Sequence, residues 1–368
     1  MTFGGYFRNR TVLVTGVAGV KGTWLALELL EAGADVVGVD IEDPNDSLHF
    51  RSSGLSDDIR FLRVDVADAD RMMGLVDQVD ALFHLAAVSL VGEARRHPVE
   101  AYRTNLLGTV TVLEAFRRSS RAERAVIVTT DKVYQPSGAA AWRENDPLFA
   151  SGPYAVSKAC ADAVAGDYHR TYLAETGKRL AVGRAGNVIV GGDFHSSERT
   201  GGAGRLFVDC YLALMRGRAP VVLNPGQRRA YLYGLDVVAG YMALMSNLDR
   251  PNVAGEAFNF GPVEPRGVDN ATLATRICAA WGESSRWTPG QGREEPFQDQ
   301  ALVWDKARTR LHWQPAFDLE TTLAETTAWY RAWQTLPGTP GAMRRFDLDQ
   351  VRRHRQRALE IGIPWARD

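Results

Sequence analysis

A glycine-rich turn between a strand and a helix is the feature that most constrains how this chain can fold. The run Thr11–Thr15 is apolar and β-branched, and Gly22–Ala32 is rich in alanine and leucine at helical spacing. The turn between them carries three glycines spaced GxxGxxG. Glycines let the backbone approach a pyrophosphate, whose charge meets the N–H groups of the helix N-terminus. The spacing is not the GxGxxG of the dinucleotide pattern, so a purely structural turn remains the alternative here. The residues of the candidate dinucleotide loop are Gly16, Gly19, Val20, Lys21 and Gly22.

Short strand-like runs alternate with helical stretches through the first half of the chain. Strands that are apolar on both faces and alternate with helices are typical of a parallel sheet covered by helices. The sequence therefore predicts an α/β protein with a doubly wound parallel sheet, a Rossmann fold. The strands are expected at Thr11–Thr15, Asp35–Asp40, Phe61–Val64, Ala81–Ala86, Ala125–Thr130 and Leu180–Arg184, and the helices at Gly22–Ala32, Val99–Arg118 and Tyr154–Thr176.

The length of 368 residues exceeds what one hydrophobic core usually serves. We expect a dinucleotide-binding domain over residues 1–190 and a smaller C-terminal lobe over 191–335 that binds the substrate. Segments around 230–260 are expected to return to the first domain. The Gly-, Ser-, Thr- and Arg-rich stretch Gly191–Gly204 is interpreted as a long loop, and residues 336–368 as a basic tail.

Composition and charge exclude several classes of protein. A net charge of −1 provides no general attraction to nucleic acid or to an acidic membrane. We therefore interpret the arginines from Arg344 to Arg357 as a solvated helix or a partner contact. Cys160, Cys210 and Cys278 are far apart, which favours buried thiols over disulfides. Without a signal-peptide pattern, a membrane-spanning run or metal-site spacing, we expect a soluble, cytoplasmic protein that binds no metal.

Asp40, at the end of the second expected strand, indicates which dinucleotide binds. An acidic residue there meets the ribose 2′-hydroxyl, and its charge would repel a 2′-phosphate. We therefore predict NAD rather than NADP; the alternative is that Asp40 is a turn residue. His84 lies inside a strand and is interpreted as a packed histidine. The residues that end the next two strands, where adenine and ribose would lie, are Asp65, Val66, Ala86 and Ala87.

Tyr154 and Lys158 are four residues apart and share one face of a helix. A nearby ammonium stabilises a phenolate, so we expect Lys158 to lower the tyrosine pKa and make Tyr154 a base for a hydroxyl proton. The fifth strand ends in Thr130, Asp131 and Lys132. Because ligands bind at the carboxyl ends of parallel strands, we expect these three side chains beside Tyr154. A polar turn capped by Asp131 is the alternative.

With these motifs in place, the sequence resembles the extended short-chain dehydrogenase/reductase superfamily from about Arg10 to Trp333, and within it the CDP-glucose 4,6-dehydratases. The superfamily pattern matches Thr15–Gly22, Asp40, His84–Ala87, Asn105, Tyr154 and Lys158. The closer resemblance is carried by Lys21–Leu25, Thr130–Lys132, Arg184–Ile189, Gly191–Asp193 and Phe258–Pro262. Relatives acting on other nucleotide sugars are similar to Thr-Asp-Glu where this chain has Thr-Asp-Lys.

The resemblance implies a lyase that converts a nucleotide-diphosphate sugar into its 4-keto-6-deoxy form. Tyr154, helped by Thr130 and Lys158, would take the C4 hydroxyl proton while NAD accepts hydride. Lys132 would remove the C5 proton, and Asp131 would protonate the departing C6 hydroxyl. A homodimer is also implied, paired through the helices Val99–Arg118 and Tyr154–Thr176. The resemblance adds Asn105 to the cofactor site and assigns substrate binding to Ser89, Asn187, Arg205 and Arg229.

Departures from the family pattern concern the substrate more than the chemistry. Relatives resemble Arg-Pro-Trp-Gln-His where this chain has Arg229–Tyr233, the loop His195–Gly204 is longer, and the tail beyond Pro337 has no counterpart. Two alternatives remain: a nucleotide-sugar epimerase, which needs no Asp-Lys pair, and a dinucleotide-sensing regulatory protein on the same fold. The nucleotide base, the exact sugar and the pathway are left open by the sequence.

Overall fold

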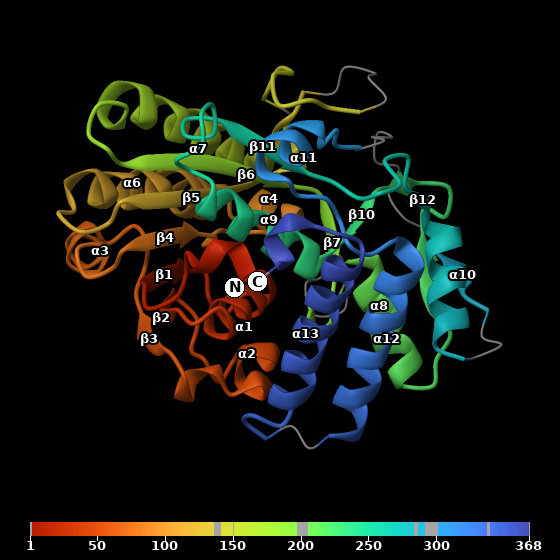
Figure 1. Ribbon diagram of the computed structural model, residues 1–368. Coiled ribbons are helices and arrows are strands. Elements are labelled where there is room, and N and C mark those ends of the chain that lie inside the picture. Colours follow the sequence, from red (N-terminus) through yellow and green to blue (C-terminus); the bar gives the residue numbers. More distant parts are fainter. Residues whose placement is uncertain are drawn as a thin grey trace.

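The computed structural model describes residues 2–135, 141–149, 151–196, 205–282, 286–290, 301–336 and 339–367. A seven-stranded sheet forms its centre, in the order β11-β6-β5-β4-β1-β2-β3 (Figure 1). Every neighbouring pair in this sheet is parallel. The predicted Rossmann fold is therefore confirmed. The strands are β1 (Thr11–Thr15), β2 (Asp35–Asp40), β3 (Arg60–Arg63), β4 (Ala81–His84), β5 (Arg124–Thr130), β6 (Arg179–Ala185) and β11 (Ala257–Phe260).

Each central strand contributes side chains to two hydrophobic cores, one on each face of the sheet. In β1, Val12 and Val14 belong to one core and Leu13 to the other, because successive strand side chains point to opposite faces. Helices α1 (Val20–Glu31) and α9 (Gly234–Ser246) pack into the first core, and α3 (Ala69–Val76) and α6 (Gly108–Arg118) into the second. This double burial explains why the strands are apolar throughout.

The strand order places a ligand crevice beside β1. The chain runs from β1 outward to β2 and β3 and then crosses to β4 on the other side of β1. In open α/β sheets such a reversal leaves a crevice at the carboxyl ends of the strands, where ligands bind. The glycine turn after β1 and the polar end of β5 both lie at this edge of the sheet.

The seventh strand, β11, is a difference from the sequence analysis. The segment Ala257–Phe260 pairs with β6 at the sheet edge, and α9 packs against β5 and β6. Phe258–Pro262 carries part of the family resemblance, but no strand is expected there from the sequence. Four residues followed by Gly261-Pro262 are too few to show a strand periodicity.

The remaining elements complete the C-terminal side and the helical layers. Three two-stranded ladders are formed by β7 (Asn187–Ile189) with β10 (Tyr231–Tyr233), β9 (Arg228–Arg229) with β12 (Val268–Asp269), and β8 (Val221–Leu223) with β13 (Thr288–Gly290). The other helices are α2 (Leu48–Ser53), α4 (Val91–Arg96), α5 (Pro98–Tyr102), α7 (Pro153–Tyr168), α8 (Leu206–Met215), α10 (Asn270–Ala280), α11 (Asp305–Leu311), α12 (Leu319–Thr335) and α13 (Arg344–Glu360). The expected helix Val99–Arg118 contains a π-helical turn, Arg103–Leu107, and a second such turn, His169–Leu173, follows α7.

The arginine-rich C-terminal segment is a helix, as expected, but one of its faces packs into the fold, which corrects the expectation that it is solvated or contacts a partner. One face of α13 is buried against α1, α2 and α12, and Figure 1 shows α13 alongside α12. Its arginines pair within the chain, for example Arg353 with Glu325 at 2.8 Å and Arg352 with Glu31 at 3.2 Å. Arginines of this segment therefore form ion pairs with acidic residues elsewhere in the fold.

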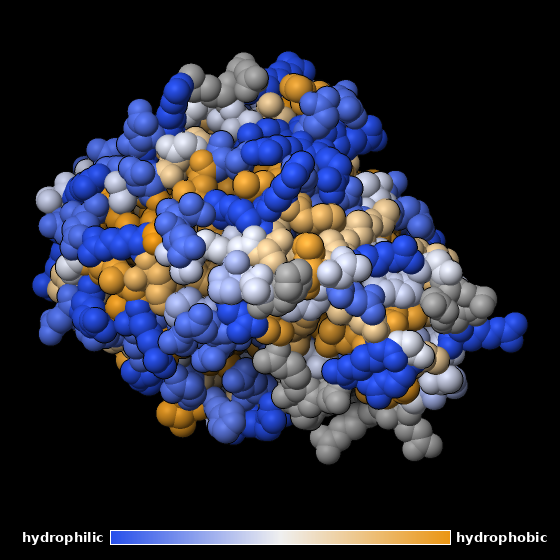
Figure 2. All heavy atoms as spheres, turned by 90° about the horizontal axis from the view of Figure 1, so that it is seen from below, coloured by the Kyte–Doolittle hydropathy of each residue, from blue (hydrophilic) through white to orange (hydrophobic). Residues whose placement is uncertain are grey.

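The two chain ends meet at the centre of the view in Figure 1. The rings of Phe3 and Trp365 stack with their centroids 5.0 Å apart. No helix in the described part of the chain is long and apolar enough to cross a membrane. On the face that Figure 2 shows, exposed hydrophobic side chains lie in several areas separated by hydrophilic ones.

Candidate active site

Two glycines of the turn after β1 leave no room for a side chain. Gly16 has a φ of 71°, and a Cβ added to it would lie 2.7 Å from the Ala86 nitrogen. A Cβ on Gly22 would lie 2.1 Å from the Gly16 carbonyl oxygen. The N-cap of α1 is Gly19, which has no side chain to bond the N–H groups of the first turn. These groups and the close backbone approach fit a bound pyrophosphate.

Asp40 ends β2 with its carboxylate turned toward this turn. Its Oδ2 accepts a hydrogen bond from the Ala18 N–H at 2.9 Å, and its Oδ1 accepts from the Ile41 N–H at 2.8 Å. Burial raises the pKa of Asp40, and the backbone N–H groups oppose that shift. The carboxylate is thereby held in one orientation at the position expected for a ribose contact.

The other residues expected on the cofactor side line the ends of β3 and β4. Asp65 forms an ion pair with Arg103 at 2.7 Å, and Val66 is buried. His84 is buried between the hydroxyls of Thr15 and Thr109, and burial lowers its pKa to about 3. It is a neutral packed histidine, as expected. Ala86 and Ala87 follow β4 and are partly exposed beside the glycine turn.

Asn105 lies in the π-helical turn between α5 and α6 and forms hydrogen bonds to the loop after β4. Its Oδ1 accepts from the Val88 N–H at 2.8 Å, and its Nδ2 donates to the Ser157 hydroxyl at 3.0 Å. π-Helical turns are frequent at functional sites. Here the turn connects the β4 loop with α7, which carries the candidate catalytic tyrosine.

Tyr154 lies in the first turn of α7 because the preceding residues start the helix there. Gly152 is the N-cap with φ 99°, a conformation that favours glycine, and Pro153 occupies the first helical position. Lys158 follows one turn later. Its Nζ is buried and donates to the Val128 carbonyl of β5 at 2.7 Å. Helix α7 therefore aligns Tyr154 and Lys158 along the end of β5.

The pKa values of this pair differ from the sequence expectation. Burial raises the pKa of Tyr154 to about 12, and the neighbouring Thr130 hydroxyl lowers it less. Burial and the like charge of Lys21 lower the pKa of Lys158 to about 7. The prediction that Lys158 lowers the pKa of Tyr154 is therefore wrong. Lys158 is itself desolvated, so its amine is only partly charged near neutral pH and stabilises a phenolate less.

The end of β5 brings the predicted acid and base side chains together. The Thr130 hydroxyl donates to Asp131 Oδ1 at 2.8 Å, and Lys132 Nζ lies 3.3 Å from the same oxygen. Lys132 Nζ also donates to Asn187 Oδ1 at 3.4 Å. Asp131 is 1% exposed, and its Oδ2 is buried without a hydrogen-bond partner among the described residues. An unpartnered buried carboxylate oxygen is costly, so it indicates a site for a substrate hydroxyl.

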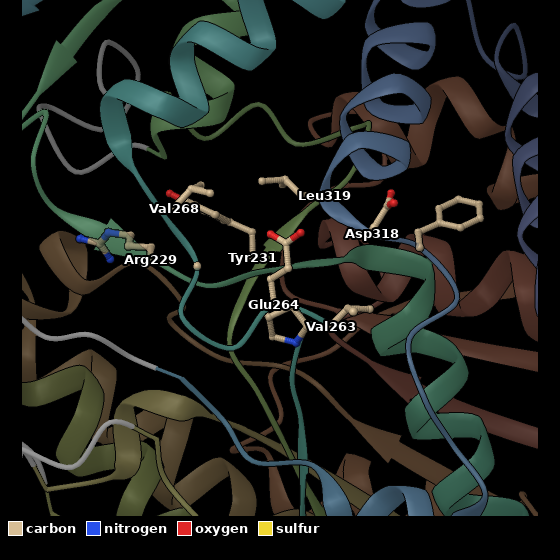
Figure 3. Close-up of a pocket in the computed structure, with 10 residues that line it drawn as sticks. Arg229, Tyr231, Val263, Glu264, Val268, Asp318 and Leu319 are labelled. Atoms are coloured by element: carbon tan, nitrogen blue, oxygen red, sulfur yellow. The ribbon is translucent and has the colours of Figure 1, made fainter.

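The two cations expected to hold the substrate, Arg205 and Arg229, belong to the C-terminal half of the chain. Arg205, at the start of α8, pairs with Asp193, and the Arg205 charge lowers the pKa of that buried carboxyl. Arg229 lines a hollow together with Tyr231 and Glu264 (Figure 3). That hollow holds only about 10 Å³, room for one water molecule, so it is not a nucleotide pocket. Ser89 is exposed on the loop after β4.

Two supporting groups were missed by the sequence analysis. One is Asp193, which was noted only as part of a family motif. The other is a buried network behind the end of β5, in which Arg184 and Asp162 pair at 2.6 Å and Thr129 donates to Asp162 at 2.9 Å. Arg184 also donates to the Tyr134 hydroxyl at 2.8 Å. The partners are far apart in the sequence, so no spacing rule indicates these pairs.

The parallel sheet, the glycine turn and the Tyr-Lys pair define an enzyme of the extended short-chain dehydrogenase/reductase class. Residues 13–326 match the family described as GDP-mannose 4,6 dehydratase. The chain therefore belongs to this family, and the predicted resemblance is confirmed.

Individual relatives agree with this assignment. The chain is 30% identical over 339 residues to a CDP-glucose 4,6-dehydratase of Salmonella typhimurium, covering 89% of this chain and 92% of that protein. A solved structure of the dTDP-glucose 4,6-dehydratase DesIV of Streptomyces venezuelae, with NAD bound, has a TM-score of 0.74 at 26% identity and covers 87% of this chain and 97% of that one. The epimerase Mth375 of Methanothermobacter thermautotrophicus has a TM-score of 0.79 at 22% identity, covers 90% of this chain and 95% of that one, and shares the fold.

Proposed function

We propose that this protein is an NAD-dependent nucleotide-sugar 4,6-dehydratase of the CDP-glucose type. The observation that carries the proposal is the pair at the end of β5. The buried carboxylate of Asp131, one oxygen of which has no hydrogen-bond partner in the part of the chain that the structure describes, lies 3.3 Å from the amine of Lys132. Dehydration needs an acid for the leaving hydroxyl and a base for a carbon-bound proton. An epimerase reaction needs neither.

In the proposed reaction each side chain moves one proton. Tyr154, assisted by Thr130 and Lys158, takes the proton of the sugar C4 hydroxyl as the alcohol becomes a ketone. Lys132 then removes the C5 proton, which the ketone has acidified. Asp131 gives a proton to the C6 hydroxyl, which leaves as water. NAD, when bound along the glycine turn and Asp40, would supply the hydride acceptor for oxidation at C4, the hydride donor for reduction at C6 and the positive charge of its oxidised ring. Lys132 would return its proton to C5 as C6 is reduced, which completes the 4-keto-6-deoxy sugar.

The structure suggests how the two ligands share the crevice. NAD would lie along the glycine turn and Asp40, with Asp65, Val66, Ala86 and Ala87 along its adenosine half. The part of the chain from 191 to 335, apart from the segment 230–260 that includes α9 and β11, forms the proposed substrate lobe. Arg205 and Arg229 of this lobe, with Asn187 from the end of the first domain and Ser89 from the opposite side, would hold the sugar diphosphate. Cys160, Cys210 and Cys278 are reduced thiols, which supports a cytoplasmic location.

A panel of CDP-, UDP-, GDP- and dTDP-sugars tests the activity. We expect loss of one water from at least one sugar, with CDP-glucose the first candidate, detected by mass spectrometry. If the enzyme only inverts a carbinol centre and no sugar loses water, the epimerase alternative replaces the dehydratase proposal. If the protein binds NAD but converts no sugar, the regulatory alternative gains support.

We expect NAD to bind at least about tenfold more tightly than NADP, because the carboxylate of Asp40 would face a 2′-phosphate with like charge. Isothermal titration calorimetry with both dinucleotides measures the difference. The Asp40→Asn variant is the matched test, since it keeps the size of the side chain and removes its charge. Comparable affinities in the wild type would contradict the proposed placement of Asp40.

We expect a homodimer formed through α5, α6 and α7. Large hydrophobic side chains are exposed along these helices and the π-helical turns beside them: Val99 is 79% exposed, Leu107 52%, Tyr172 48% and Tyr102 37%. A two-fold axis would pair this surface with itself. Light scattering at micromolar concentration should give twice the chain mass, and Leu107→Glu should shift the protein toward monomer. A monomeric wild type would exclude the dimer.

A further inference from the structure

The C-terminal helix α13 places one buried carboxylate against the rest of the fold. Asp347 has no exposed surface, and its Oδ1 accepts a hydrogen bond from Trp329 Nε1 at 2.7 Å. Its Oδ2 lies 3.5 Å from His49 Nε2. Asp347 and Trp329 both lie beyond residue 326, where the family match ends. This contact therefore belongs to a part of the chain that the family pattern does not describe.

The Trp329 ring, which is bonded to Asp347, and the His49 ring beside it close over a glycine turn. A Cβ added to Gly191 would lie 2.1 Å from Trp329 Cγ, and one on Gly192 would lie 2.4 Å from His49 Cγ. Gly192 also has a φ of 84°, which favours glycine. On the other side, Trp24 Nε1 donates to the Gly191 carbonyl at 3.0 Å. The turn is thus fixed by three aromatic rings from α1, α2 and α12.

This turn leads directly to the carboxylate that orients Arg205. Asp193 is 1% exposed, and its side chain accepts hydrogen bonds from Arg205 and from His195 Nδ1. Its carbonyl accepts a hydrogen bond from the Tyr330 hydroxyl, so both its backbone and its side chain are held. A displacement of the Gly191–Gly192 turn would therefore move the Arg205 guanidinium.

We propose that Asp347 is a positioning residue for the substrate diphosphate, acting through Trp329, His49 and the Gly191–Gly192 turn on the Asp193–Arg205 pair. The inference rests on the proposed function, in which Arg205 binds the diphosphate. Helix α13 then sets the geometry of the substrate site, although it supplies no residue to it.

The test compares Asp347→Asn with Asp349→Asn, a control two residues along the same helix whose carboxylate is half-exposed and pairs with Arg352. Asp347→Asn keeps an oxygen for Trp329 and removes the charge facing His49. We expect KM for CDP-glucose to rise roughly tenfold with kcat nearly unchanged, because misplacing a binding group by about 1 Å can cost up to about a hundredfold. The control should match the wild type, and calorimetry with CDP should show the same loss of affinity in Asp347→Asn.

A double-mutant cycle with Arg205→Ala tests the route. If Asp347 acts through Arg205, Asp347→Asn should change KM little once Arg205 is alanine. Trp329→Phe, which keeps the ring over Gly191 and loses the N–H donor, gives a second variant if Asp347→Asn folds poorly. A lower melting temperature with unchanged KM, or an equal KM shift in the Arg205→Ala background, would overturn the inference. A wild type that neither dehydrates a nucleotide sugar nor binds CDP would instead refute the proposed function.

Discussion

Replacing Tyr154 with phenylalanine is expected to abolish turnover while leaving NAD and nucleotide-sugar binding nearly unchanged. The phenyl ring keeps the packing at the start of α7, and only the proton acceptor for the C4 hydroxyl is lost. A positioned acid or base contributes about a hundred- to ten-thousandfold to the rate. Product formation measured by mass spectrometry should fall by at least that range, and calorimetry should show intact binding.

The pKa of Tyr154 makes this prediction more specific. Its pKa is about 12 in the protein alone, so the phenol is protonated at neutral pH and needs a nearby positive charge to act as a base. Tyr6→Phe is the matched control, since Tyr6 lies between Arg10 and Arg124 at the amino end of the sheet. Wild-type activity in Tyr154→Phe would remove Tyr154 from the mechanism.

Replacing Lys132 with methionine should separate dehydration from oxidation at C4. Methionine keeps most of the side-chain bulk but cannot accept the C5 proton. Elimination should therefore fall by about a hundred- to ten-thousandfold. Oxidation at C4 depends on Tyr154 and NAD, so the absorbance of reduced cofactor should still develop in a single turnover.

Deuterium exchange at C5 in heavy water, followed together with water loss, measures this effect. Deuterium exchange and water loss should fall together in Lys132→Met. Both should persist in the control Lys306→Met, because Lys306 lies on α11 and pairs with Glu256 at 2.6 Å. If Lys132→Met dehydrates at the normal rate, the lysine has only a structural role. The C5 proton would then pass to Asp131 or to water.

The fold and the candidate catalytic side chains could be predicted from local sequence. Six of the seven sheet strands, the glycine turn, Asp40 and the polar end of β5 all lie within short segments whose residue types have a direct physical meaning. Strand alternation, glycine turns and a tyrosine four residues before a lysine depend on backbone geometry, which neighbouring residues determine. The family resemblance then supplied roles for those residues.

Burial and long-range pairing were decided by the tertiary structure. The arginines from Arg344 to Arg357 indicated a solvated helix or a partner contact because acidic partners such as Glu31 and Glu325 lie far away in the chain. Likewise, the sequence predicted a lowered pKa for Tyr154, since spacing shows that Lys158 is near but not that both groups lose water. The desolvation of a group depends on all the residues packed around it. Its effect on a pKa therefore cannot be predicted from neighbouring residues in the sequence.

The sequence by itself therefore determined the Rossmann architecture, the family and the side chains available for catalysis. Only the tertiary structure decided how one Asp131 oxygen is buried without a hydrogen bond to any described residue. It also decided how Asp193 pairs with Arg205 and how α13 contacts the Gly191–Gly192 turn through Asp347 and Trp329. The contact of Asp347 with His49 joins residues from opposite ends of the chain. These arrangements depend on how the sheet, the substrate side and the last helix pack together.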